Sequence, residues 1–92
     1  MRLDMFLKTS RLILRRSLAQ EFCDKGAISV NGAAAKSSKE VKPGDEIEIR
    51  RGNKLTRVRI TLVPDKKQVA KNEAAGLYTM LEETRTEDPL LP

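Results

Sequence analysis

The sequence lacks the residues on which most enzyme and metal chemistry depends. It has no histidine, a single cysteine (Cys23) and only 3% aromatic residues. Zinc is held mainly by cysteine and histidine, and most nucleophilic side chains are activated by a neighbouring histidine. We therefore expect a protein that is not an enzyme and that holds neither a metal ion nor another cofactor. A single cysteine also excludes an internal disulfide and fits a reducing cytoplasm.

Long apolar segments are absent as well. No run of eighteen apolar residues could span a membrane, and no apolar segment typical of a signal peptide follows Arg2 and Lys8. A length of 92 residues indicates one domain, and the scarcity of aromatic residues indicates an aliphatic core. We expect a cytoplasmic monomer that contacts no membrane.

Positive charge is present in excess and unevenly placed. The formal net charge is +5. Residues 1–63 contain 14 Lys/Arg and 7 Asp/Glu, a net of +7, whereas residues 64–92 contain four basic and six acidic residues, a net of −2. This separation favours a body that binds a polyanion and a tail with another role, although a merely soluble basic protein is an alternative.

Hydrophobic spacing predicts three helices. Leu3, Phe6 and Leu7 predict a first helix over residues 3–7. Ser17 as an N-cap, with Gln20 completing a capping box and Gly26 as terminator, predicts a second helix over about 18–25. Helical spacing near the C-terminus predicts a third helix over about 72–84, on the residues Ala74, Leu77, Tyr78 and Leu81.

Alternating apolar residues predict the strands, and turn residues separate them. Asn31-Gly32 is the preferred dipeptide of a tight hairpin turn, and a second hairpin loop is expected at residues 51–54. The predicted strands cover residues 28–30, 33–37, 46–50 and 55–63.

The densest early positive charge immediately precedes the second helix. Arg11, Arg15 and Arg16 lie within six positions. A helix start offers unpaired N–H groups, and guanidinium groups match phosphate geometry, so together they favour a phosphate backbone. The alternative is a solvated link whose arginines pair with Glu21 or Asp24.

The order of these motifs resembles an RNA-binding domain first named for the fourth small-subunit ribosomal protein. The resemblance spans residues 2 to about 50. It implies an α+β fold in which two short helices pack on a small bent antiparallel sheet of about four to five strands, here followed by a C-terminal helix. The matching motifs are Arg2-Leu3-Asp4, Arg16-Ser17-x-Ala19, Gly26-x-Ile28-x-Val30-Asn31-Gly32 and Gly44-Asp45-x-Ile47.

A closer resemblance, to the RqcP (YabO) proteins of bacteria, covers nearly the whole chain. It rests on MRLDMFLKTSRLILRRSLAQEF, VNGAAAKSSKEVKPGDEIEIR and AAGLYTMLEE. It implies a non-catalytic protein that binds 23S-type rRNA of the large ribosomal subunit and stalled peptidyl-tRNA. It also implies assistance to an RqcH-type factor in adding an alanine tail. The expected organisation is an RNA-binding domain over 1–63, and a linker, an amphipathic helix and a frayed tail over 64–92.

The resemblance also implies the roles of individual residues. Arg2 and Arg16 match the motif arginines and are expected to contact rRNA and tRNA phosphates. Asp4 either orients Arg2 or Arg16, or is a plain first-turn carboxylate, and Ser17 is expected to cap the helix beside the RNA. The remaining candidates near this RNA surface are Lys8, Arg11 and Arg15. Lys36, on the predicted returning strand, either reaches RNA or does not, and the two alternatives have equal weight.

A second basic cluster surrounds the later hairpin. Strand side chains alternate between faces, so some of these residues must point away from the first cluster. The cluster either contacts another rRNA segment or only blunts an exposed sheet edge. It consists of Arg50, Arg51, Lys54, Arg57 and Arg59.

Three other functions compete. The related heat-shock ribosome-binding protein of fifteen kilodaltons usually carries a long basic extension, whereas residues 64–92 here are net acidic. A protein-interaction adaptor would dock through the helix predicted over 72–84. A fragment of a pseudouridine synthase or tRNA synthetase is not expected, because the chain has no room for a catalytic domain.

Overall fold

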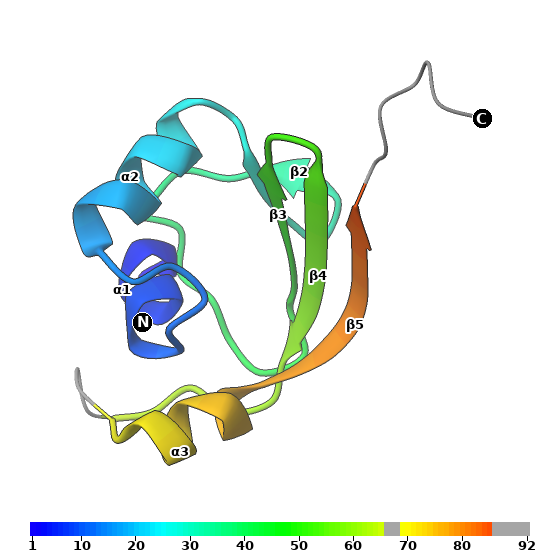
Figure 1. The fold of residues 1–92 in the computed structure, drawn as a ribbon. Helices are drawn as coiled ribbons and strands as arrows, with labels where there is room; N and C mark the ends of the chain where they lie inside the picture. Colours follow the sequence, from blue (N-terminus) through cyan, green and yellow to red (C-terminus); the bar gives the residue numbers. More distant parts are fainter. Residues whose placement is uncertain (66–68, 86–92) are drawn as a thin grey trace.

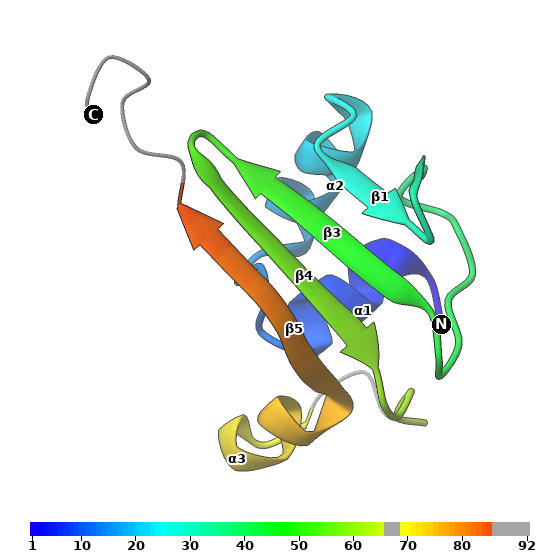
Figure 2. The same cartoon turned by 90° about the vertical axis from the view of Figure 1, so that its right-hand side faces the viewer.

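One antiparallel sheet carries two helices on one of its faces. The computed structural model describes residues 1–65 and 69–85. Its five strands are ordered β2-β1-β3-β4-β5. Figure 1 shows α1 (Leu3–Thr9) and α2 (Arg16–Asp24) beside the sheet, and Figure 2 shows the opposite face of the sheet uncovered. The predicted α+β class, with two short helices on a small antiparallel sheet, is confirmed.

The first helix is fixed by its apolar face and by a distant loop. Leu3, Phe6 and Leu7 are fully buried, as their spacing predicted. The first N–H groups of a helix have no partner within it. Here Leu3 N–H donates to the carbonyl of Lys39 at 2.7 Å and Asp4 N–H to that of Ser37 at 3.1 Å. The loop after β2 therefore completes the start of α1.

The second helix begins two residues earlier than predicted, and its capping box is absent. Arg15, with extended backbone angles (φ −126°, ψ 135°), precedes the helix, and no side chain caps it. Ser17 is the second helical residue. Gln20 donates instead to the carboxylate of Asp4, at 2.8 Å. A buried carboxylate needs donors, and this requirement explains why Gln20 turns toward α1. Gly26, at φ +76°, follows the helix as predicted.

The hairpin of β1 (Ile28–Val30) and β2 (Ala33–Ala34) forms around the predicted turn. Asn31 and Gly32 have φ of 53° and 87°, the left-handed values that a tight hairpin turn needs. The strand predicted over 33–37 nevertheless ends at Ala34. Ala35 N–H still donates to the carbonyl of Ile28 in β1, and the chain then leaves the sheet, because the carbonyls of Ser37 and Lys39 accept from the start of α1.

The central hairpin contributes four buried apolar side chains to the core. β3 (Glu46–Arg51) pairs with β4 (Lys54–Ile60), and the inward residues Ile47, Ile49, Val58 and Ile60 are buried. The prediction that β4 continues to residue 63 is wrong. The N–H groups of Thr61 and Leu62 both donate to the carbonyl of Leu77 instead, and Leu62, within the predicted strand, is 56% exposed.

The prediction of one helix over residues 72–84 is wrong. The chain forms a single turn, α3 (Lys71–Ala74), a 3-10 turn η1 (Ala75–Leu77) and then a strand, β5 (Tyr78–Arg85). Ala74 and Leu77 are buried, as helical spacing suggested. Gly76 weakens any longer helix, and the unpaired edge of β4 offers a full ladder of hydrogen bonds to the residues after it. Sheet pairing therefore overrides the apolar pattern.

The predicted division of the chain into a domain over 1–63 and a tail over 64–92 is only partly covered by the described residues. β5 pairs with β4 across the expected boundary at residue 63, and the division into 1–63 and 64–92 stays a prediction. The expected frayed tail, EDPLLP at residues 87–92, lies outside the described residues. Within 1–65 and 69–85, no helix has the length and apolarity needed to cross a bilayer.

Candidate nucleic-acid interface

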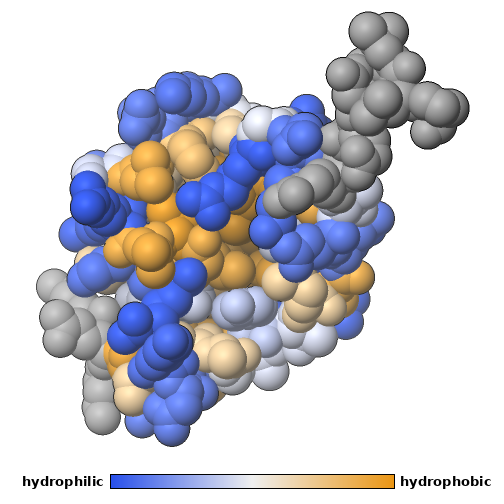
Figure 3. All heavy atoms as spheres, viewed as in Figure 1, coloured by the Kyte–Doolittle hydropathy of each residue, from blue (hydrophilic) through white to orange (hydrophobic). Residues whose placement is uncertain are grey.

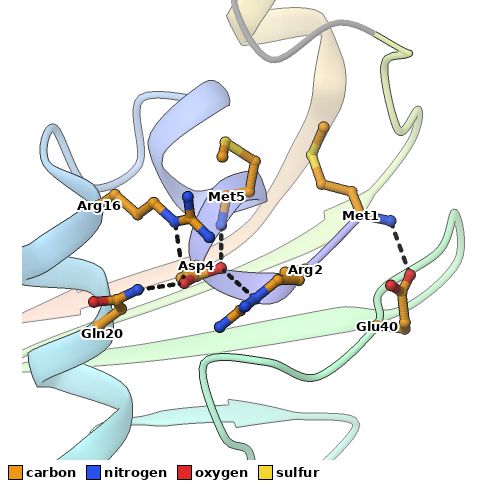
Figure 4. A network of polar contacts seen from close by, with 7 residues as sticks. All are labelled: Met1, Arg2, Asp4, Met5, Arg16, Gln20 and Glu40. Carbon is orange, nitrogen blue, oxygen red and sulfur yellow. Dashed lines mark hydrogen bonds and ion pairs between the residues drawn. The ribbon is translucent and has the colours of Figure 1, made fainter.

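A buried carboxylate joins the starts of the two helices. The side chain of Asp4, in the first turn of α1, is fully buried. Its Oδ1 accepts from Met5 N–H at 2.7 Å and lies 3.3 Å from Arg2 Nε. Its Oδ2 accepts from Gln20 at 2.8 Å and from Arg16 Nε at 3.2 Å. Figure 4 shows the four donors converging on this carboxylate, from Met5 in α1, from Arg2 just before it, and from Arg16 and Gln20 in α2.

The surroundings of Asp4 keep it ionised. Burial by itself would raise the pKa of this carboxyl. The hydrogen bonds from Gln20 and Arg16, together with the positive charges of Arg16 and Arg2, outweigh burial and lower its pKa below the ordinary 3.8. Of the two readings left open for Asp4, the contacts favour a residue that orients both arginines.

Asp4 fixes both arginines but leaves some of their N–H donors free to bind another group. Each meets Asp4 through Nε, yet 46% of the Arg2 side chain and 40% of the Arg16 side chain remain exposed. A guanidinium has five N–H donors, so each retains several for another anion. Arg2 directly precedes α1 and Arg16 is the first residue of α2. Asp4 thus holds two partly exposed guanidinium groups at the starts of the two helices, each with N–H donors left for an anion.

The start of α2 opens onto a surface hollow. The hollow has a volume of about 370 Å³ and is lined by Arg15, Ser17, Leu18 and Glu21 of α2, with Leu14 and Arg51. Leu14 is 74% exposed, whereas its neighbour Ile13 is fully buried and pins the link to the core. Figure 3 shows apolar surface crossed by hydrophilic side chains on this face of the molecule. Cationic and apolar side chains alternate there. Cationic side chains suit the phosphate backbone of a nucleic acid, and apolar ones suit its bases.

Arg11 faces a smaller hollow that adjoins the sheet. Its backbone has φ +63°, an uncommon value for a residue other than glycine. The hollow, of about 140 Å³, is lined by Arg11, Arg51, Lys54 and residues of β5, among them Glu83, which forms an ion pair with Lys54. Arg51 lines both hollows, so Arg11, Arg15, Arg51 and Lys54 all lie on the helical face.

The second basic cluster is split between the two faces of the sheet, as alternation predicted. Arg50, Arg57 and Arg59 lie on the uncovered face, where each pairs with a glutamate. Arg57 Nη2 lies 3.1 Å from Glu82, Arg59 Nη2 3.3 Å from Glu46, and Arg50 Nη2 3.5 Å from Glu48. The suggestion that this cluster blunts a sheet edge is wrong for β4, since β5 pairs along it.

The other candidates lie outside the Asp4 cluster. Lys8 is in the last turn of α1, and Lys36 is exposed just past the end of β2 rather than on that strand. Arg11 and Arg15 form no ion pair within the described residues, so the alternative pairing with Glu21 or Asp24 is not seen there. Glu21 pairs instead with Lys25, at 3.2 Å.

Sequence reasoning missed two contributors. Gln20 was interpreted as a capping residue, although its spacing from Arg16, four positions along a helix, places both on one face. The second is Phe22, which the motifs did not mark as a site residue: the Arg51 guanidinium lies 5.3 Å from its ring centre, in cation–π range. Cys23, in α2, is buried. Burial and the charges of Asp4 and Asp24 raise the pKa of its thiol to about 11.

Comparison with known proteins decides the family. The sequence matches the S4 domain family over residues 1–47. It is 53% identical to a protein of Bacillus subtilis (strain 168) named RQC P-site tRNA stabilizing factor, over 92% of this chain and 96% of that protein. The chain belongs to the RqcP family. A relative of the same name from Streptococcus pneumoniae (strain ATCC BAA-255 / R6) is 50% identical over 96% of this chain and 98% of its own length.

Solved structures agree with the fold of this RqcP-family chain. The trimeric structure of Vibrio cholerae heat shock protein 15 superposes with a TM-score of 0.79 and 33% identity, over 88% of this chain and 81% of that one. Two of the named relatives are considerably more similar in sequence than this structure is. The family resemblance inferred from the motifs is confirmed.

Proposed function

We propose that this protein is a non-catalytic RNA-binding factor of ribosome-associated quality control. It binds the large ribosomal subunit that holds stalled peptidyl-tRNA and stabilises that tRNA for addition of an alanine tail by an RqcH-type factor. The names of its relatives, RQC P-site tRNA stabilizing factor, support the tRNA part of this proposal. Its place of action is the cytoplasm, and it acts as a monomer.

The observation that carries the proposal is the pair of arginines held by Asp4. Arg2 directly precedes α1 and Arg16 begins α2, and both are fixed by one buried carboxylate while nearly half of each side chain remains exposed. Fixed guanidinium groups bind phosphate with little further loss of conformational entropy. Arg11, Arg15, Ser17 and Lys54 extend this surface along the helical face. In this proposal Lys8 and Lys36 are peripheral contacts with 23S-type rRNA.

Co-sedimentation with ribosomal subunits tests the proposal. Subunits that carry peptidyl-tRNA should retain more protein than empty large subunits. With about four to six phosphate contacts, affinity should fall roughly a hundred- to ten-thousand-fold between about 50 and 200 mM monovalent salt, through counterion release. Equal retention on both kinds of subunit, or a flat response to salt, would count against the proposal. Crosslinking in cells and sequencing of the bound RNA would name the contacted segments.

A heat-shock-type ribosome-binding protein is the second candidate, and the likeness to the Vibrio cholerae structure favours it. This candidate predicts that the nascent chain increases retention of the protein on the large subunit and that the tRNA adds nothing further. Release of the nascent chain with puromycin, leaving tRNA on the subunit, separates the two. The adaptor alternative has lost its docking element, because residues 78–85 form a strand and not a helix.

A further inference from the structure

A third hollow lies directly beside Arg2 and Arg16. It has a volume of about 500 Å³ and is lined by both arginines. This volume lies in the range of about 300–1,000 Å³ that small-molecule sites occupy. Its apolar walls come from three separate parts of the chain, the N-terminus, α1 and the segment after β4: Met1, Met5, Val63 and Pro64.

The wall formed by Met1 is fixed in place. The α-amino group of Met1 pairs with Glu40 at 2.9 Å, and the Met1 carbonyl accepts from Val41 N–H at 3.0 Å. Met5 is anchored from the other side, because its N–H donates to Asp4. Figure 4 shows the Met1 and Met5 side chains extending to the same side of α1. The hollow is therefore preformed next to the arginines.

The chemistry of the walls selects one part of a nucleotide. Glu40 and Asp65 also line the hollow, and their carboxylates repel a phosphate inside it. Thioethers make favourable contacts with aromatic rings, and the proline and valine walls are apolar. A carboxylate can accept a hydrogen bond from the amino group of a base. A phosphate suits the arginines at the rim, whereas a base suits the hollow.

We propose that this hollow receives one unstacked nucleobase of the RNA strand whose phosphates Arg2 and Arg16 bind. The inference rests on the proposed RNA-binding function and adds to it. It makes the protein a reader of single-stranded loops or flipped nucleotides rather than of duplex backbone alone. Sequence-specific RNA recognition commonly uses splayed bases in this manner.

Two RNA probes separate base binding from phosphate binding. One is a hairpin with a single-stranded loop, cut from the RNA segment that crosslinks to the protein, and the other is its stem as a blunt duplex. Met5→Gln should weaken binding to the hairpin about three- to tenfold, the scale of one thioether's burial, and leave the duplex unchanged. Met5→Leu should restore hairpin binding. Leu62→Gln, at an exposed apolar site outside the three hollows, is the matched control and should change neither.

A change in the RNA provides the complementary test of base binding. An abasic nucleotide at the crosslinked loop position should reproduce the loss in the wild-type protein and cause no further loss in Met5→Gln. If Arg16→Ala weakens binding to both probes while Met5→Gln retains full hairpin affinity, the hollow takes no base and the proposed function stands. Equal losses of Met5→Gln on duplex and hairpin would likewise overturn the base site. If Arg16→Ala leaves both probes bound, the RNA-binding proposal itself fails.

Discussion

The two faces of the sheet carry arginines in opposite settings. On the uncovered face, three arginines alternate with three glutamates, and each forms an ion pair. On the helical face, Asp4 serves two arginines at once, and Arg11 and Arg15 form no ion pair within residues 1–65 and 69–85. Similar residues thus balance charge on one face and accumulate it on the other. Placement relative to acids, rather than the number of cations, marks the candidate binding face.

The register of the strands explains the difference. Glu46 lies opposite Arg59 and Glu48 opposite Arg57 in the β3–β4 pair, and Arg57 lies opposite Glu82 in the β4–β5 pair. Opposite charges at directly facing positions stabilise a sheet. On the helical side of the β4–β5 pair the described strand residues contribute one ion pair, Lys54 with Glu83. The arginines of the helical face come from helix starts and loops, where no strand register places an acid opposite them.

The largest effect that would test this comparison is on RNA binding. Arg16→Ala should cost about 1.5–3 kcal/mol of binding to large subunits, a ten- to hundredfold loss, because a charge-assisted contact disappears. Arg16→Lys should restore binding only in part, since an ammonium lacks the planar fork. Arg59→Ala, on the neutralised face, should change affinity less than about threefold.

Co-sedimentation is measured beside circular dichroism and thermal melting for each variant. Arg16 and Arg59 are both partly exposed, so both variants should fold. A well-folded Arg16→Ala protein that co-sediments normally would remove the helix-start cluster as the RNA site. The hairpin arginines would then become the leading candidates.

A somewhat smaller effect is expected on stability at Asp4. Asp4→Asn should lower the free energy of unfolding by about 1–3 kcal/mol at neutral pH, through weaker hydrogen bonds to Gln20 and Arg16. The folded pKa of Asp4 is lowered, so its stabilisation is complete above the unfolded pKa and is lost as pH falls through the folded value. The gap between wild type and Asp4→Asn should therefore close below about pH 4.

Urea titrations between neutral and acidic pH measure that gap. The matched control is Glu82→Gln, which removes a carboxylate from the uncovered face. A constant difference between wild type and Asp4→Asn over this pH range would contradict the ionised, stabilising role of Asp4. Asp4→Asn should lose less RNA affinity than Arg16→Ala does, because both arginines persist in the Asp4→Asn variant.

The sequence predicted the parts of this fold that local pattern controls. The apolar face of α1, the left-handed turn at Asn31-Gly32 and the alternation of β3 all follow from spacing and turn chemistry. The end of the chain did not, because Ala74, Leu77 and Leu81 fit a helix equally well. The ladder of hydrogen bonds along β4 decides in favour of a strand, and that ladder is visible only after the sheet has formed.

The candidate site was predictable in its residues but not in its connections. Arg2, Asp4 and Arg16 follow from the motif, whereas Gln20 was assigned to a cap that does not exist. The Ser-x-x-Gln spacing is compatible with two arrangements. In one, Gln20 completes a capping box, and in the other, Gln20 donates to a buried acid that faces the first turn of the helix. The tertiary position of Asp4 distinguishes them, and no local pattern encodes it.

A smaller effect should come from a single ion pair on the uncovered face. Arg57 and Glu82 are both about half exposed, so the pair should contribute only about 0.2–1 kcal/mol to stability. A double-mutant cycle of Arg57→Ala and Glu82→Ala, followed by urea unfolding, measures the coupling. Neither single variant should reduce co-sedimentation as Arg16→Ala does. A coupling above about 2 kcal/mol would mean that this face is more rigidly organised than its exposure indicates.

The smallest effect is expected at Ser17. A helix cap there would make Ser17→Ala cost about 0.5–2 kcal/mol, but Ser17 is exposed within α2 and no side chain caps the helix. We therefore expect a change within about 0.5 kcal/mol in urea unfolding. Gln20→Ala should cost about 1 kcal/mol, since it removes a hydrogen bond to the buried Asp4. The two changes should be additive, because these side chains share no bond. A clear loss from Ser17→Ala, coupled to that from Gln20→Ala, would restore the capping box and move the start of α2 beyond Arg16. The arginine would then stand in the link before the helix, and its fixed geometry beside Asp4 would no longer follow from the fold.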